Sequence, residues 1–279
     1  MTKQRLCGKL KAMNDLSNQW LNDVDFDWLE HVVRAAGAIA LRHFRHASAM
    51  RKPDNTLVTV ADRQVEAFLR EALSQAFPAD GLLGEEMAAQ CGHSGRVWAI
   101  DPIDGTATYA AGLPVWGVSV GLLQDWQPLA GIFYMPLLDE LYLSDGRQAL
   151  FNGQVVRVDE SQHIDSESFL VVTSETHRTY RIDFEGKTRT FGSAAAHICY
   201  VARGTAVAAL LGRLSLWDIA GALPVLQAAG GSLAYLTHTA QPLDLSSLAD
   251  GRKTAEPLLA GAPWALEYFA SRIVPLGDA

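Results

Sequence analysis

The sequence predicts an α/β protein built from two lobes that share an interface. Helical hydrophobic periodicity dominates to about residue 77, short strands dominate to about residue 158, and strands then alternate with helices. A polar stretch at 159–166 separates the last two patterns. We therefore expect an N-terminal lobe at 25–160 and a C-terminal lobe at 161–279, with residues 1–24 as an extension before the fold.

The first lobe is predicted to begin with two helices. At 25–46, apolar residues recur at spacings of three and four, which places them on one face of a helix. A second helix is predicted at 61–77 and ends at Pro78 and the turn that follows it. Apolar runs bounded by turn residues then predict strands at 82–84, 97–100, 115–123, 129–135, 141–144 and 155–158.

The second lobe is predicted to alternate strands and helices. Ser193 is a candidate N-cap for an Ala-rich helix that ends near residue 201. A helix at 217–229 should end at the Gly-Gly pair that follows it, and Pro224 should kink it. The remaining expected elements are strands at 169–173 and 205–211 and a last helix at 264–272.

The composition excludes several classes of protein. With 49% hydrophobic and 19% charged residues, the chain is globular and too apolar to be disordered. No run approaches the roughly 18 apolar residues of a membrane-spanning helix, so no membrane association is expected. The 31 acidic residues outnumber the 23 basic ones, and this net charge of −8 disfavours nucleic acid as a partner.

The cysteines and the N-terminus bear on the compartment. Three widely spaced cysteines, Cys7, Cys91 and Cys199, predict neither a disulfide framework nor a thiolate zinc site. They favour free thiols in a reducing compartment. The first 21 residues lack the apolar run of a secretory signal, so we expect a cytoplasmic protein.

The segment 101–106, Asp-Pro-Ile-Asp-Gly-Thr, is the strongest functional signal. It follows the strand predicted at 97–100, so Asp101 is expected at the carboxyl end of that strand. Gly105 permits a tight turn, and the backbone N–H groups of such a turn can bind an anion. Because Asp101 and Asp104 would repel a phosphate there, a cation must lie between them. The combination predicts a hard divalent metal with oxygen ligands, most simply Mg²⁺.

Structural explanations compete with this interpretation. Asp and Gly dominate turns, so an Asp-rich turn that caps a helix would account for the segment taken alone. Glu85 and Glu86 follow a short predicted strand in an apolar neighbourhood, where Glu85 could be a solvated loop charge. Asp218 lies at the start of a predicted helix, where it could be an N-cap residue.

Taken together, these residues resemble those of the inositol monophosphatase family, which comprises Mg²⁺-dependent, lithium-sensitive phosphatases. The resemblance runs from about Phe26 to the C-terminus and implies a layered α-β-α-β-α sandwich in two lobes, with the site between them. Four segments carry it in the family's order: Lys52 through Leu57-Val58-Thr59 to Asp62, Gly84-Glu85-Glu86, Trp98 to Thr106, and Trp217-Asp218 to Gly230-Gly231.

The resemblance implies two or three Mg²⁺ ions held by carboxylates and one carbonyl oxygen. Asp101 would bridge two of them, and a third, weaker ion would lie near Glu85 and Asp62. The implied ligands are Glu85, Asp101, the backbone carbonyl of Ile103, Asp104 and Asp218.

The resemblance also implies the catalytic groups. Asp62, Thr106 and Glu85 would form the catalytic set, in which Asp62 and Thr106 orient the attacking water and help to deprotonate it. Glu86 would align the metal ligands. The backbone N–H groups of Gly105 and Thr106 would bind the phosphate of the substrate.

The substrate is expected to be a small polyol or sugar phosphate. Gly192, Ser193 and Ala194 match the family's segment near the substrate's hydroxyls. Leu211 stands where inositol-specific members carry a glutamate that contacts a sugar hydroxyl. A leucine cannot accept that hydrogen bond, so the fit to inositol phosphates themselves is weakened.

Several alternatives remain open at this point. Related enzymes of this fold act on histidinol phosphate or fructose 1,6-bisphosphate, and a regulatory protein with a vestigial site is a third possibility. A haloacid-dehalogenase-type phosphatase is disfavoured, because that class needs an Asp-x-Asp pair, whereas Asp101 and Asp104 stand in an Asp-x-x-Asp pattern. The resemblance further implies a homodimer.

Overall fold

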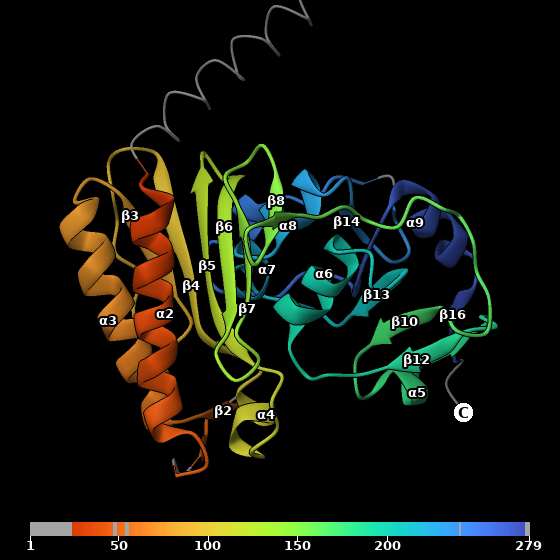
Figure 1. Ribbon diagram of the computed structural model, residues 1–279, viewed down its shortest axis with the longest axis horizontal. Coiled ribbons are helices and arrows are strands. Elements are labelled where there is room, and N and C mark those ends of the chain that lie inside the picture. Colours follow the sequence, from red (N-terminus) through yellow and green to blue (C-terminus); the bar gives the residue numbers. More distant parts are fainter. Residues whose placement is uncertain (1–23, 47–48, 54–55, 240, 277–279) are drawn as a thin grey trace, which may run out of the picture.

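The computed structural model describes residues 24–46, 49–53, 56–239 and 241–276. The predicted extension therefore lies, apart from Val24, outside the described residues. Figure 1 shows five layers: a helix pair, a sheet, a group of helices, a second sheet and a last helix. This α-β-α-β-α arrangement confirms the predicted fold class.

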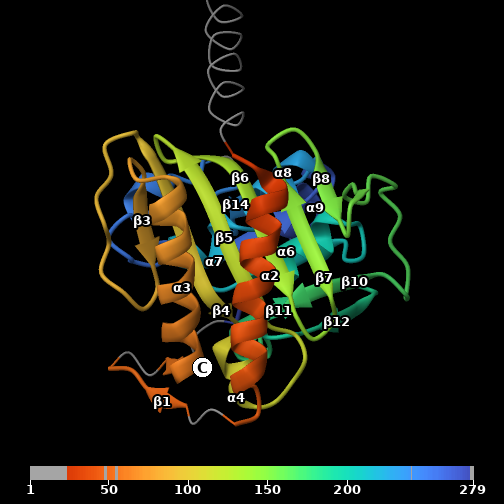
Figure 2. The same cartoon turned by 60° about the vertical axis from the view of Figure 1, so that its left-hand side comes forward.

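The first layer consists of α2 (Phe26–His43) and α3 (Val60–Ala76), which lie side by side across one face of the first sheet (Figure 2). Each helix begins at a side-chain cap. The Asp25 carboxylate accepts hydrogen bonds from the backbone N–H groups of Asp27 and Trp28, and Thr59 caps α3. The two helices begin and end within three residues of their predicted bounds.

The first sheet has seven strands in sequence order, and apart from the parallel pair at its start all its neighbours are antiparallel. One face packs on α2 and α3, and the other faces the middle helices. The strands are β3 (Gly81–Gly84), β4 (Arg96–Asp104), β5 (Gly117–Gln124), β6 (Gln127–Met135), β7 (Glu140–Ser144), β8 (Ala149–Phe151) and β9 (Gln154–Val155).

Strand β4 is longer than predicted, and this difference positions the acidic segment. The sequence predicted that the strand ends at Ile100, but β4 continues to Asp104. Asp101 pairs with Ser119 and Asp104 with Gly117, so the register shifts by one residue between them. Pro102 lies inside this irregularity, where a residue that cannot donate a ladder hydrogen bond is tolerated.

The middle layer contains α6 (Ala194–Ala202), α7 (Leu216–Ala220) and α8 (Leu223–Ala228). Ser193 caps α6 as predicted, since its hydroxyl accepts a hydrogen bond from the backbone N–H of Ala196. The single kinked helix predicted at 217–229 is wrong, because the chain breaks between α7 and α8. Pro224 lies in the first turn of α8, where no helical hydrogen bond needs its N–H.

The break between α7 and α8 lets their backbone approach the sheet. A Cβ atom added at Gly121 on β5 would lie 2.2 Å from the Ala220 carbonyl oxygen, and one at Gly131 on β6 would lie 2.3 Å from that of Gly221. Side chains between these backbones would therefore force the layers apart.

The second sheet has the strand order β12-β10-β13-β15-β14. Its first three strands are mutually parallel, so their carboxyl ends meet at one edge, and the last two are antiparallel to their neighbours. The strands are β10 (Phe169–Val172), β12 (Lys187–Arg189), β13 (Ala208–Leu211), β14 (Ser232–Tyr235) and β15 (Leu258–Gly261), and α9 (Pro263–Ala270) covers the sheet's far side.

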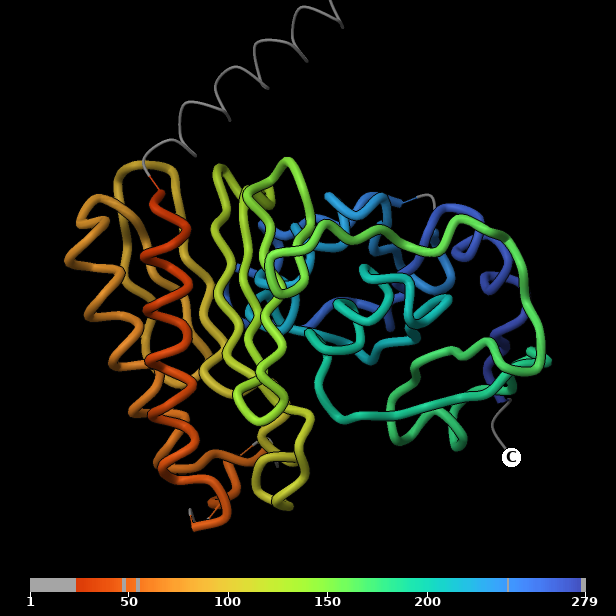
Figure 3. The backbone as a smooth tube through the Cα atoms, viewed as in Figure 1, coloured from red at the N-terminus to blue at the C-terminus, as the bar shows by residue number. Residues whose placement is uncertain are grey.

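Short elements complete the described part of the chain. They are β1 (Met50–Arg51), β2 (Leu57–Val58), α4 (Thr106–Ala110), α5 (Thr176–Thr179), β11 (Tyr180–Ile182), the 3₁₀ turn η1 (Leu245–Leu248) and β16 (Ile273–Pro275). The segment 156–168 runs as an extended connection from the first sheet to the second (Figure 3). This matches the predicted polar link at 159–166.

Two further strand predictions need correction. The strand predicted at 155–158 covers only the end of β9, because Val158 leaves the sheet and its backbone N–H bonds to the Ala229 carbonyl oxygen. Strand β8 was not predicted, and the strand predicted at 205–211 begins only at Ala208. Among the described residues, no helix combines the length and the apolar character that a membrane crossing requires.

Candidate active site

Three aspartates from two layers meet at the end of β4. Asp101 and Asp104 come from β4, and Asp218 comes from the first turn of α7. Each offers a carboxylate oxygen that lies within 4.8 Å of the others. Asp101 and Asp104 are 2% and 4% exposed, which is rare for carboxylates that have no cation nearby.

The surrounding backbone fixes two of these carboxylates. Asp104 accepts hydrogen bonds from the Ser193 hydroxyl and from the backbone N–H groups of Ala194 and Ala195, at 3.1 and 2.8 Å. These donors lie at the start of α6, where anions are favoured. Asp218 accepts a hydrogen bond of 2.8 Å from the backbone N–H of Ser215, so Ser215 and not Asp218 is the N-cap residue.

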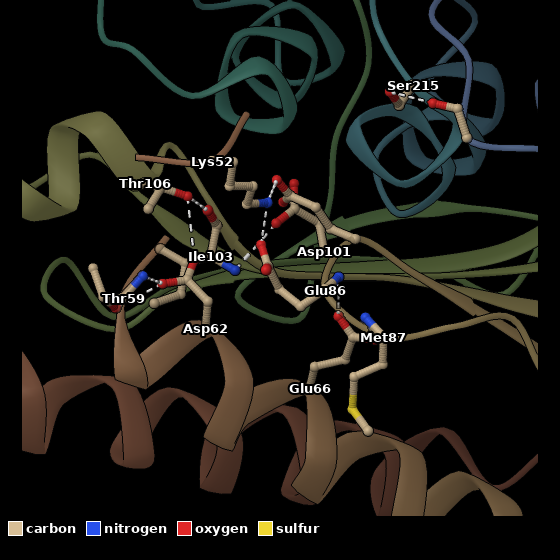
Figure 4. Close-up of polar contacts among 12 residues, drawn as sticks. Lys52, Thr59, Asp62, Glu66, Glu86, Met87, Asp101, Ile103, Thr106 and Ser215 are labelled. Atoms are coloured by element: carbon tan, nitrogen blue, oxygen red, sulfur yellow. Dashed lines mark hydrogen bonds and ion pairs between the residues drawn. The ribbon is translucent and has the colours of Figure 1, made fainter. Parts of the chain in front are cut away.

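Glu85 and Glu86 follow β3, and the Lys52 side chain pairs with both of them; Figure 4 shows Lys52 and Glu86 beside Asp101. The Lys52 ammonium is 2.8 Å from a Glu85 carboxylate oxygen and also pairs with Glu86. All three side chains are less than one fifth exposed. Lys52 thus supplies positive charge to this side of the site.

A hydrogen-bonded chain links α3 to the turn after β4. The hydroxyl and the backbone N–H of Thr59 both donate to one oxygen of Asp62, at 2.6 and 2.8 Å. The Thr106 hydroxyl lies 3.2 Å from the other Asp62 oxygen and 3.0 Å from the Ile103 carbonyl oxygen (Figure 4). Because a hydroxyl has one proton, Thr106 donates to one of these acceptors at a time and keeps lone pairs free.

The sequence analysis missed Glu66, which holds the Glu85-Glu86 turn in place. Its buried carboxylate accepts hydrogen bonds from the backbone N–H groups of Glu86 and Met87, at 2.7 and 3.1 Å. Arg70, one helical turn later, pairs with it at 3.2 Å. The only sequence signal was a glutamate on the apolar face of a predicted helix beside Val65.

Burial and mutual repulsion favour the neutral forms of these acids. Burial raises the pKa of Glu85 to about 7, although Lys52 opposes the shift. Burial raises the pKa of Asp104 to about 6, and burial together with Asp104 raises that of Asp218 to about 7. Burial and the surrounding carboxylates raise the pKa of Asp101 well above its usual range. A bound cation would reverse these shifts.

The donor set fits a hard divalent cation. A cavity of about 440 Å³ opens over the three aspartates and is also lined by Glu85, Ile103 and Thr106. Its available ligands are carboxylate and carbonyl oxygens, which Mg²⁺ prefers, and the cavity has room for a small phosphorylated molecule. Thiolate and imidazole ligands, which softer metals select, are absent from its lining.

The structure brings most of the predicted site residues to this cavity. Asp62 and Glu86 do not line the cavity themselves; Asp62 contacts Thr106, and Glu86 contacts Lys52. Gly192 lines both this cavity and a neighbouring one of about 230 Å³. The other predicted substrate contacts line only the neighbouring cavity, and they are Ser193, Ala194 and Leu211.

Gly105 allows the turn after β4 to approach the start of α6 beside this site. Its φ of +92° suits glycine, and an added Cβ would lie 3.1 Å from the Gly192 carbonyl oxygen and 3.3 Å from the Ser193 Cβ. The turn after β4 and the start of α6 are therefore in direct contact. The predicted phosphate-binding N–H groups of Gly105 and Thr106 open α4 at this point.

Comparisons with known proteins match nearly the whole described chain. The family model described as "Inositol monophosphatase family" matches residues 24–267. A histidinol-phosphatase of Chlorobaculum parvum is 36% identical over 209 residues, which cover 70% of this chain and 80% of that protein. A fructose-1,6-bisphosphatase/inositol-1-monophosphatase of Aquifex aeolicus is 30% identical over 213 residues, covering 72% and 80%.

A solved structure gives the same result for the fold. The inositol monophosphatase of Anabaena (Nostoc) superposes with a TM-score of 0.72 at 26% identity. The match covers 93% of this chain and 98% of that structure. The family match therefore extends over both sheets and includes every residue of the site described above.

Proposed function

The chain belongs to the inositol monophosphatase family and is a phosphoric monoester hydrolase, and from this premise we propose that it hydrolyses a small polyol or sugar phosphate with the help of Mg²⁺. The cluster of Asp101, Asp104 and Asp218, with carboxylate oxygens within 4.8 Å of one another over an open cavity, carries this proposal. A vestigial site would have no reason to retain so many buried, mutually repelling carboxylates.

The cluster would hold two or three ions. Glu85, Asp101 and the Ile103 carbonyl oxygen suit one ion, and Asp101, Asp104 and Asp218 suit a second. When bound, the ions would supply positive charge for the phosphate and lower the pKa of a water molecule. This charge resolves the difficulty of binding an anion in an acidic cleft.

The protein's own groups would orient and deprotonate the attacking water. The Thr106 hydroxyl accepts a hydrogen bond from the water while it donates to Asp62. Burial raises the pKa of Asp62, which makes its carboxylate a better proton acceptor. The backbone N–H groups of Gly105 and Thr106 would hold the phosphate, and Glu86 would keep Glu85 and Lys52 aligned.

Histidinol phosphate is a second candidate substrate, because the Chlorobaculum relative carries that activity in its name and is 36% identical. Histidinol bears an ammonium group, which a carboxylate in the leaving-group region would bind. The cavity beside the site, which contains Leu211 and Gly192, has no acidic lining residue. We therefore favour an uncharged or anionic alcohol over a cationic one.

Asp218→Asn tests the proposal. The amide keeps an oxygen that can accept the Ser215 N–H, whereas the negative charge is lost. We expect Mg²⁺-dependent phosphate release from a panel of sugar, inositol and polyol phosphates to fall by about 100-fold or more. The thermal midpoint in EDTA should be unchanged or raised.

Asp250→Asn provides the matched control, because the exposed Asp250 carboxylate pairs with Arg252 and does not line the cavity over the cluster. It should retain full activity. Full activity of Asp218→Asn would rule out the metal assignment.

Family membership supports three further proposals. We propose that lithium inhibits the enzyme, that the protein is a homodimer and that it is cytoplasmic. Inhibition assays, light scattering and cell fractionation test these proposals in turn.

A further inference from the structure

Ser193 lies between the end of β4 and the start of α6. The residue borders the neighbouring cavity of about 230 Å³, but it is only 1% exposed. Its hydroxyl donates to the Asp104 carboxylate and accepts a hydrogen bond of 3.1 Å from the backbone N–H of Ala196. A hydroxyl has one proton, so Ser193 has none left to donate to a substrate oxygen. The hydroxyl is therefore committed to groups of the protein itself.

The two oxygens of the Asp104 carboxylate have different surroundings. Oδ2 accepts from the Ser193 hydroxyl and, at 2.8 Å, from the backbone N–H of Ala195, whereas Oδ1 accepts from that of Ala194 at 3.1 Å. Oδ1 thus keeps the greater lone-pair capacity for a cation. The orientation of the carboxylate decides which oxygen is offered to the cluster, and the two donors on Oδ2 hold that orientation.

Two glycines allow Ser193 to approach this carboxylate. Gly105 and Gly192 have φ of +92° and +86°, which suit glycine. A Cβ added at Gly105 would lie 3.3 Å from the Ser193 Cβ, and one added at Gly192 would lie 2.1 Å from the Thr108 hydroxyl oxygen. The Ser193 hydroxyl is therefore held by closely packed backbone on both sides of the contact.

The same hydroxyl has a second task in the middle layer, because Ser193 is the N-cap residue of α6. The N-terminus of a helix favours a negative charge, and here that charge is the Asp104 carboxylate. One side chain thus joins a helix cap to a carboxylate 89 residues away in sequence. The resemblance had placed Ser193 among the substrate contacts, and these hydrogen bonds give it a different role.

We propose that Ser193 is a positioning residue for the cation at Asp104 and does not contact the substrate. The inference rests on the proposed function, because it takes the aspartate cluster to bind a divalent ion. Without the hydroxyl, Oδ2 keeps only one of its two donors and the carboxylate gains freedom to turn. The ion at Asp104 is then bound more weakly, since partners of metal ligands typically contribute about 10- to 100-fold to metal affinity.

Calorimetric titration with Mn²⁺ in the absence of substrate tests the proposal, because Mn²⁺ prefers the same oxygen ligands as Mg²⁺. Asp104→Asn identifies the binding step to which Asp104 contributes. Ser193→Ala should weaken that step by about tenfold or more. Ser193→Thr restores the hydroxyl and should return the affinity to within about threefold of the wild type. An affinity in Ser193→Ala within about twofold of the wild type, or no recovery in Ser193→Thr, would overturn the proposal.

Asp25→Ala is the matched control, because Asp25 caps α2 through the backbone N–H groups of Asp27 and Trp28 and does not line the cavity over the aspartates. Asp25→Ala and Ser193→Ala should each lower the thermal midpoint in EDTA by about 2–4 °C, since each loses a helix cap. Only Ser193→Ala should weaken Mn²⁺ binding. Equal weakening in Asp25→Ala would mean that metal affinity follows general stability, and the proposal would fail.

Kinetics separate this role from substrate binding and from the proposed function. At saturating Mg²⁺, the KM of Ser193→Ala for the most rapidly hydrolysed compound of the phosphate panel should stay within about twofold of the wild type. A KM raised about tenfold with unchanged Mn²⁺ affinity would make Ser193 a substrate contact and overturn the proposal. If the wild type hydrolyses no compound, the proposed function fails, whereas Mn²⁺ binding still decides the role of Ser193.

Discussion

Thr106 shows how one hydroxyl can serve two roles in the site. Its backbone N–H begins α4 beside the cavity, and its side chain lies 3.2 Å from Asp62 and 3.0 Å from the Ile103 carbonyl oxygen. Only the hydroxyl can pass a proton from water towards Asp62. The side chain and the backbone can therefore be separated by substitution.

Thr106→Val should lower kcat by about 100-fold or more, because it removes the proton path to Asp62 but keeps the shape and the backbone N–H. The Mg²⁺ concentration for half-maximal activity should stay within a few-fold of the wild type. Thr106→Ser restores the hydroxyl and should recover most of the rate. If the valine and serine variants have equal kcat, the hydroxyl has no part in proton transfer.

Glu66 illustrates a residue that the sequence could not assign. It lies on the buried face of α3, where periodicity predicts an apolar side chain, and its partners are backbone N–H groups at positions 86 and 87. Hydrogen bonds to the backbone leave no pattern in the partner residues. The carboxylates that face the cavity were predictable because Asp101, Asp104 and Gly105 lie close together in sequence.

Glu66→Gln should weaken Mg²⁺ activation, because an amide has only one oxygen to accept the two backbone N–H groups that position Glu85 and Glu86. We expect the Mg²⁺ concentration for half-maximal activity to rise about tenfold or more, while kcat at saturating Mg²⁺ changes less. Glu71→Gln, on the exposed side of the same helix, is the control. An unchanged Mg²⁺ requirement in Glu66→Gln would show that the turn carrying Glu85 and Glu86 keeps its geometry without the Glu66 carboxylate.

At the scale of elements, local sequence signals located most helices and strands. They did not show where a helix breaks or how far a strand continues. Capping residues and turn residues marked α2, α3 and α6 well, because those signals act within a few residues. The break between α7 and α8 and the extension of β4 depend on contacts between layers. Gly221 packs on β5 and β6, and no local pattern around Pro224 reveals such a contact.

The contact between α7 and the first sheet sets the position of Asp218. Gly121→Ala would place a methyl group 2.2 Å from the Ala220 carbonyl oxygen, so α7 must move away from β5. We expect a loss of about 2 kcal/mol in the free energy of unfolding, together with weaker Mg²⁺ activation. Denaturant unfolding and Mg²⁺ titration of activity measure the two effects.

Gly212→Ala is the control for stability, since an added Cβ would have only a Thr173 methyl at 3.9 Å nearby. Its free energy of unfolding should stay within about 0.5 kcal/mol of the wild type. If Gly121→Ala is as stable as this control, the sheet and α7 are not packed as closely as the backbone indicates.

At the scale of the whole molecule, the acidic site makes stability depend on pH and on metal. The sequence predicted a cation from the juxtaposition of carboxylates. It could not show how completely Asp101 and Asp104 are buried, since this burial involves contacts of β4 with α6 and α7, which are distant in sequence. Without a cation, the folded protein favours protonated carboxyls. Folding, metal binding and proton release are therefore linked.

The metal-free protein should lose stability as pH rises from about 4 to 7. The pKa values of Glu85 and Asp218 are raised to about 7 in the fold from 4.5 and 3.8, so in this window the folded state binds more protons than the unfolded state. Stability then falls with rising pH and levels off above 7. Asp250, whose hydrogen bonds with Arg252 lower its pKa to about 2, has the opposite effect, but only below pH 4.

Mg²⁺ should replace the protons that are bound to the buried carboxyl groups of the site. It should therefore raise the thermal midpoint more at about pH 8 than at about pH 5, where protons compete for the same oxygens. Thermal unfolding in EDTA and in Mg²⁺ across this range measures both trends. In Asp101→Asn one repelling charge is absent, so the decline in EDTA should be shallower and the Mg²⁺ effect largely lost. A metal-free midpoint that rises between pH 5 and 7, with an equal Mg²⁺ effect at both ends, would mean that the buried carboxylates do not bind the cation.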